Sequence, residues 1–156
     1  MSTEKWIAGT VGLTWATCGF STEVNSVVNG NAIIAASAND NSSNLDMFAD
    51  LSVSLGSITP GAGAPYIGFY LMPLNQDGTS YGDGRFGSSA AGPPASNYWI
   101  GNIPCIASTA GVVTGMIRGI ILPPGSFKFC LYNVSGVTLA SGSNTIKWRT
   151  YNRSVA

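Results

Sequence analysis

The sequence predicts an all-β protein: a single antiparallel β-sandwich of jelly-roll type, with about eight strands and one long loop. Three observations indicate this class. Short runs with a two-residue hydrophobic period recur along the 156 residues, and convincing helical periodicity is almost absent. Gly, Pro, Asn and Ser separate these runs. The length suits one domain with its own core, which we expect to span residues 1–156.

The beginning of the chain has the weakest strand pattern. Residues 1–25 are expected to form an N-terminal arm, with weak strand candidates at 6–8, 13–18 and, after the Asn29-Gly30 turn signal, 32–36. The opening residues MSTEKWIAGT lack a basic segment followed by an apolar one, so we expect no signal peptide.

Segment 49–57 is the clearest strand, because apolar and polar residues alternate along it. This period predicts a half-buried strand with one solvated face. The buried face would hold Ala49, Leu51, Val53 and Leu55, and the solvated face Asp50, Ser52 and Ser54.

Segment 66–74 (YIGFYLMPL) is apolar on both faces. Ile67, Phe69 and Leu71 oppose Tyr66, Tyr70 and Met72, so we expect a second sheet on one side and a neighbouring subunit on the other. The following segment, 75–97, is rich in Gly, Ser and Pro and has no core pattern. Long loops of this kind are usually functional or flexible, and we interpret this one as the main contact surface.

Four more strands are expected at 99–103, 112–122, 126–133 and 145–151. Pro123-Pro124-Gly125 predicts a tight turn between the second and third of these. Arg118 lies among apolar neighbours, which predicts a position at an edge or rim. Alternation predicts that five residues of the last two strands fill the core: Phe127, Phe129, Leu131, Ile146 and Trp148.

The residue types argue against catalysis and against a cofactor. Histidine is absent, which removes Ser-His-Asp and Cys-His catalysis and the usual zinc sites. The three cysteines have no metal-binding spacing, and we expect them to be small buried hydrophobic residues. Residues 82–87 match GxGxxG, but no helix pattern follows to hold a phosphate. We therefore expect no enzyme, no cofactor and no metal site.

The charge composition limits the classes of partner that the protein is expected to bind. Charged residues make up 9% of the chain, against about 25% in a typical soluble domain, and seven basic side chains balance seven acidic ones. Neither nucleic acid nor an anionic membrane would be attracted, and no run is long enough to span a bilayer. Either Ser, Thr, Asn and Gly solvate a surface with so few charges, or other chains cover much of it. We favour cover by other chains, including copies of itself, with solvation contributing.

Aromatic side chains in and beside the long loop are the best candidates for that contact, because exposed rings anchor protein interfaces and stack on sugars. With two arginines, the candidate interface residues are Tyr66, Tyr70, Tyr81, Arg85, Phe86, Tyr98, Trp99 and Arg118.

Four stretches carry a resemblance to a family: PYIGFYLMPLNQDGTSYGDGRF, PPASNYWIGNIP, RGIILPPGSFKFCLYNVSG and SGSNTIKWRTYN. As a set, covering about residues 30–156, they resemble small virion structural proteins of tailed bacteriophages, of the minor capsid type known as head decoration or cement proteins. The resemblance implies a β-sandwich on the capsid surface, made in the host cytoplasm, that binds the major capsid protein and bridges neighbouring capsomers. It implies a homo-oligomer, a trimer or dimer.

A second function stays open from the residues alone. Jelly rolls also host carbohydrate sites, so the chain is alternatively a receptor-binding module of a phage tail or fibre. That alternative predicts an exposed aromatic platform around Tyr81, Tyr98 and Trp99.

Overall fold

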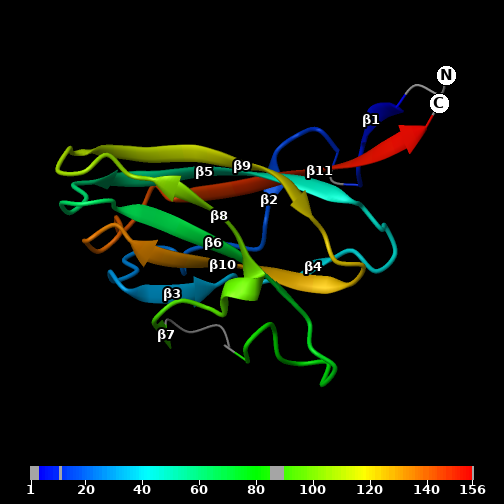
Figure 1. Ribbon diagram of the computed structural model, residues 1–156, viewed down its shortest axis with the longest axis horizontal. Helices are drawn as coiled ribbons and strands as arrows, with labels where there is room; N and C mark the ends of the chain where they lie inside the picture. Colours follow the sequence, from blue (N-terminus) through cyan, green and yellow to red (C-terminus); the bar gives the residue numbers. More distant parts are fainter. Residues whose placement is uncertain (1–3, 11, 85–89, 156) are drawn as a thin grey trace.

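The computed structural model describes residues 4–10, 12–84 and 90–155, and it is a sandwich of two antiparallel sheets (Figure 1). Sheet A, the upper layer in Figure 1, contains β1 (Glu4–Ala8), β2 (Ala16–Thr17), β5 (Phe48–Ile58), β9 (Gly111–Ile121) and β11 (Thr145–Val155). Sheet B contains β3 (Asn31–Ile34), β4 (Asn39–Asp40), β6 (Tyr66–Pro73), β7 (Ala90–Ala91), β8 (Trp99–Pro104) and β10 (Ser126–Val134). A short 3₁₀ turn, η1 (Ser96–Tyr98), precedes β8. The predicted all-β class is confirmed.

The strand pairing is nested, as in a hairpin that has been folded over itself. β2 pairs with β11, β3 with β10, β5 with β9, and β6 with β8. Each successive pair lies inside the previous one along the chain, and the pairs alternate between the two sheets. This is the eight-stranded jelly roll, to which β1, β4 and β7 add short strands.

Aromatic residues fill the space between the sheets. The rings of Phe127, Phe129 and Trp148 meet edge to face, with centroids 5.5 to 5.8 Å apart. These three residues, with Leu131 and Ile146, are all buried, which confirms the core predicted for the last two strands. Gly115 of β9 allows close packing at the side of the sandwich, because a Cβ there would lie 2.8 Å from side-chain carbons of Ile103.

β5 follows its predicted alternation with one exception. Ala49, Leu51, Val53 and Leu55 are buried in the core, as expected. Asp50 was expected on the solvated face, but only 4% of it is exposed. The prediction of a solvated Asp50 is wrong because neighbouring side chains on the outer surface of sheet A enclose the carboxylate.

Residues 1–25, for which we expected an arm, divide into two parts where they are described. Cys18, Phe20 and Val24 are buried in the main core, so this stretch belongs to the body of the sandwich instead. β1 pairs along the end of β11, from Ala8 opposite Tyr151 to Glu4 opposite Val155. These two strands extend from one corner of the molecule and bring both ends of the chain together (Figure 1).

The outer face of sheet B is also covered, but by the chain itself. Tyr70, Met72 and Cys130 are buried there with Ala32 and Ile34 in a second apolar cluster. Tyr81 and Tyr98, from the long segment 75–97 and its end, pack against this cluster. The expected neighbouring subunit is therefore not needed to explain the two apolar faces of β6.

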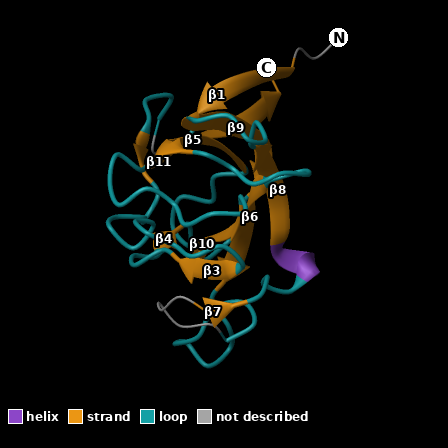
Figure 2. Ribbon diagram, turned by 90° about the vertical axis from the view of Figure 1, so that its left-hand side faces the viewer, coloured by secondary structure: helices purple, strands orange, loops and turns teal. Residues whose placement is uncertain are grey.

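The long segment is more ordered than its composition predicts. Leu74 forms a β-bridge with Tyr81, and the Asp77 carboxylate accepts hydrogen bonds from the amides of Thr79 and Ser80. These bonds, with the Ser80 hydroxyl as the largest contributor, lower the pKa of Asp77 to about 2. Further along, β7 pairs with β3 at the edge of sheet B, at the far end of the molecule from β1 (Figure 2).

Candidate functional site

The predicted interface residues do not form one surface. Tyr66, Tyr70, Tyr81 and Tyr98 lie on or beside the outer face of sheet B, and Trp99 begins its edge strand β8. Arg118 lies on β9 in the opposite sheet. Arg85 and Phe86 lie outside the described residues.

Most of these tyrosines are engaged by their own chain. Tyr70 is only 7% exposed, and burial raises the pKa of its hydroxyl. Tyr81 lies under the ammonium of Lys128, which is 5.1 Å from the ring centroid. The prediction of Tyr70 as a contact residue is wrong. The two-residue period places Tyr70 on the outer face, but it does not reveal that the long segment folds back over that face. Trp99 and Arg118 are exposed, as a contact role requires.

Exposed apolar side chains gather along the open side of the sandwich formed by β8, β9 and the loop between them. We call this surface the β9 side and define it by Trp99, Ile106, Val112, Met116 and Ile121. Ile106 and Ile121 are each 75% exposed, and Val112 and Trp99 are more than half exposed. Isolated surface hydrophobic residues are ordinary, but a group on one side of a protein marks a contact surface.

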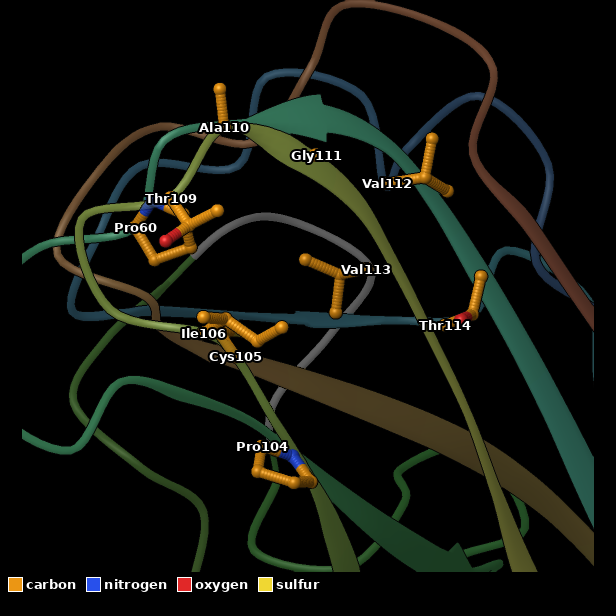
Figure 3. A pocket seen from close by; sticks show the side chains of 10 residues that line it. All are labelled: Pro60, Pro104, Cys105, Ile106, Thr109, Ala110, Gly111, Val112, Val113 and Thr114. Atoms are coloured by element: carbon orange, nitrogen blue, oxygen red, sulfur yellow. The ribbon is translucent and has the colours of Figure 1, made fainter.

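A hollow of about 160 Å³ opens at one end of the β9 side (Figure 3). Pro60, Pro104 and Ile106 form its walls, with the first residues of β9. Val112 and Val113 both line the hollow, with their side chains on different sides of the strand (Figure 3). The wall is mainly apolar and holds no carboxylate, so it suits an apolar side chain of a partner.

A second hollow, of about 500 Å³, lies at the other end of the β9 side. Trp99 of β8 and Ile121 of β9 line it, with Pro123 and Pro124 of the following turn. The β9 side therefore carries a hollow at each end and exposed apolar residues along β9, with the exposed Thr114 and Arg118 among them.

A third hollow, of about 380 Å³, lies on the outer face of sheet A, and sequence reasoning missed most of it. Trp6 is 64% exposed and meets the rings of Phe48 and Tyr151 edge to face, at 5.6 and 5.2 Å. The residues that line the hollow are Trp6, Leu13, Asp50, Arg118, Arg149 and Tyr151. The sequence carried one signal of this site. Residues 147, 149 and 151 are spaced by two, which predicts that their side chains share one face of the last strand.

Asp50 organises the polar side of this third hollow. One carboxylate oxygen accepts two hydrogen bonds from the Arg149 guanidinium, and the other accepts one from the Tyr151 hydroxyl at 3.1 Å. The Gly119 amide also donates to it, at 3.1 Å. Burial, followed by the charge of Asp50, raises the pKa of the Tyr151 hydroxyl. The site can therefore stack and hydrogen-bond a ligand.

Comparison with known proteins finds no family model and no curated protein that matches this sequence. Within the described part of the chain, three or more His, Cys, Asp or Glu residues nowhere cluster in a way that would hold a metal ion. The described residues also contain no helix that is long and apolar enough to cross a membrane.

Proposed function

We propose that this chain is a non-enzymatic structural protein of a phage virion. It binds the outside of the capsid, contacts the major capsid protein and further copies of itself, and bridges neighbouring capsomers. The resemblance of residues 30–156 to virion structural proteins supports this proposal. The jelly roll supports it as well, because this architecture recurs in viral capsid domains.

The observation that carries the proposal is the β9 side. Its five large apolar side chains lie on one surface of a protein that otherwise has a complete core of its own. Burying one such side chain contributes roughly 1.5–3 kcal/mol. Several copies that bind one shell at once multiply weak individual contacts into tight attachment. A clamp between capsomers needs this combination of a stiff body and an apolar contact strip.

The test is binding to capsids of the encoding virus that were assembled without this protein. We expect the unmodified chain to co-sediment with the particles and to appear on the outer shell in cryo-electron microscopy. Ile121→Asp would reduce binding at least tenfold, because it places a charge in the buried strip. Val28→Asp is the matched control, since Val28 is 53% exposed but lies away from the β9 side. A particle whose outer shell excludes the chain would refute the proposal.

Carbohydrate binding is the second candidate, and the hollow around Trp6 favours it. An exposed indole beside hydrogen-bonding carboxylate and guanidinium groups is suited to stack on a sugar ring and hold its hydroxyls. The platform predicted around Tyr81, Tyr98 and Trp99 is the weaker location, because Tyr81 and Tyr98 pack against the outer cluster of sheet B. A glycan array with the unmodified chain and with Trp6→Ala decides this. Binding that is lost in Trp6→Ala supports the candidate, and an array without signal removes it.

A further inference from the structure

The outer edges of the two sheets differ in how well they resist the addition of another strand. In the described structure sheet A ends in β1 and β9, and sheet B ends in β7 and β8. β7 has two residues, and β1 has five with Lys5 near its centre. β8 has a register irregularity opposite Phe69 and Tyr70, and it ends at Pro104. Short length, lysine, bulges and proline are the features with which proteins block edge-to-edge association.

β9 lacks these features over most of its length. It has 11 residues, and residues 111–117 (GVVTGMI) include neither a charge nor a proline. One edge of β9 pairs with β5. Among the described strands, none pairs with its opposite, outward edge. Val112 and Met116 are exposed on the same face of the strand. The register of β9 with β5 is regular from Val113 to Ile117. It shifts between Ile117 and Ile120, and again between Gly111 and Val113, where the extra residue lies on β5. Residues 111–117 are therefore an uncharged and open edge with a regular stretch from Val113 to Ile117.

We propose that β9 pairs with β9 of a second copy of this chain across a twofold axis, which joins the two A sheets into one continuous antiparallel sheet. An isologous contact uses the same residues twice, so it needs a strand that is complementary to itself. With the axis at Thr114, this residue lies opposite Thr114 of the partner subunit. Val112 then lies opposite Met116 of the partner subunit, so both exposed apolar residues become paired.

The charges of the strand agree with this register. Arg118 is the one charged residue of β9, and it lies opposite Ala110 of the partner subunit. The two arginines are then separated by eight residues, about 27 Å at about 3.4 Å per residue. Threonine opposite threonine and apolar opposite apolar are favourable cross-strand pairs, whereas like charges directly opposite would oppose pairing. Self-pairing thus buries the apolar edge without placing one arginine against the other. This inference does not depend on the function proposed above.

Cysteine cross-linking tests the register. In Thr114→Cys the two new side chains face each other with Cβ atoms about 4.5–5.5 Å apart, close enough for a disulfide after small adjustments. Oxidised glutathione supplies the oxidant, and each disulfide formed releases two molecules of reduced glutathione. We expect a covalent dimer on a non-reducing gel. Thr138→Cys is the matched control, because Thr138 is an exposed threonine away from β9. The unmodified chain controls for the partly exposed Cys105.

Lysine substitution tests the edge without cross-linking. Val112→Lys should raise the dissociation constant of the dimer at least tenfold, whereas Val28→Lys should leave it unchanged. Sedimentation velocity measures both, and far-ultraviolet circular dichroism verifies that each variant is folded. A monomeric mass of 16.1 kDa for the unmodified chain at high concentration would overturn self-pairing. Equal cross-linking of Thr114→Cys and Thr138→Cys would also overturn it, as would capsid binding through β9 by a chain that stays monomeric. In each of these cases the capsid-binding assay still tests the proposed function separately.

Discussion

The carboxylate of Asp50 accepts two hydrogen bonds from the guanidinium of Arg149, at 3.1 Å from Nε and 2.8 Å from Nη2. The two residues lie opposite each other on β5 and β11, at the middle of sheet A. Because Asp50 also accepts a hydrogen bond from Gly119 of β9, one carboxylate connects three strands. The pair therefore supports the fold and shapes the hollow beside Trp6.

Replacement of Asp50 by alanine should lower the free energy of unfolding by about 2–3 kcal/mol, since it leaves the Arg149, Tyr151 and Gly119 donors without their acceptor. The cost stays at this level because the Arg149 side chain is 32% exposed and reaches water. Urea denaturation measures it. Ser54→Ala, on the same face of β5, should change stability by less than about 0.5 kcal/mol. Equal midpoints for both variants would contradict the structural role of Asp50.

The stability of the protein should fall at high pH in a way that depends on Tyr151. Burial and the Asp50 charge raise the pKa of this hydroxyl above its ordinary value of 10.0. The folded state then holds the proton more tightly than the unfolded chain does. The resulting stabilisation is fully present below pH 10 and is lost as the pH rises through the folded-state pKa. Urea midpoints between pH 9 and pH 12 should decline more steeply for the unmodified protein than for Tyr151→Phe. Parallel declines would contradict this assignment.

Asn133 should be among the polar residues on which stability depends most. Its amide is fully buried, and it donates to the carbonyls of Val27 and Val137, both at 2.8 Å, while it accepts from the Ser135 amide. Asn133→Ala leaves the Ser135 amide without its acceptor and removes one donor from each carbonyl, although the Leu139 amide still donates to Val27 and the Ser135 hydroxyl to Val137. The loss should cost about 2 kcal/mol in urea denaturation. Asn102→Ala changes an exposed asparagine of β8 and should have little effect. A small loss in Asn133→Ala would show that water replaces the amide.

The three thiols should react at very different rates. Burial raises the pKa of Cys18 to about 12, and Cys130 is buried as well, whereas Cys105 is partly exposed. At pH 8 roughly one Cys18 thiol in ten thousand would be ionised even if reagent could reach it. Mass spectrometry after treatment with a thiol reagent should find Cys105 modified in the folded protein. Cys18 and Cys130 should be modified only in urea. Rapid labelling of Cys18 without denaturant would contradict its burial.

Local alternation was sufficient to predict the long strands and the side of each that faces the core, but not the two-residue strands β4 and β7. The pattern of residues 126–133 predicted that Phe127, Phe129 and Leu131 face inward, because side chains that alternate along a strand meet the opposite sheet at every second position. Strand order was beyond local reasoning. The pairing of β2 with β11 joins residues 16–17 to 147–148, and no feature of either segment identifies the other.

The candidate sites were predicted less well, for the same reason. Asp50 is buried only because the register of β5 with β11 places Arg149 beside it. Trp6 becomes part of an aromatic group only because β1 lies along the end of β11. The aromatics near the long loop were visible in sequence, but which of them the loop itself covers depends on how that loop folds back.

The nested order of strands has a consequence for how the protein is made. β11 lies between β1 and β2 on one side and β5 on the other, and it follows all three along the chain. Until β11 has left the ribosome, the nascent chain cannot close sheet A, and the apolar faces of β5 and β10 have no lasting cover. Products truncated before β11 would therefore be substrates for chaperones and proteases, so that only chains containing β11 accumulate in folded form.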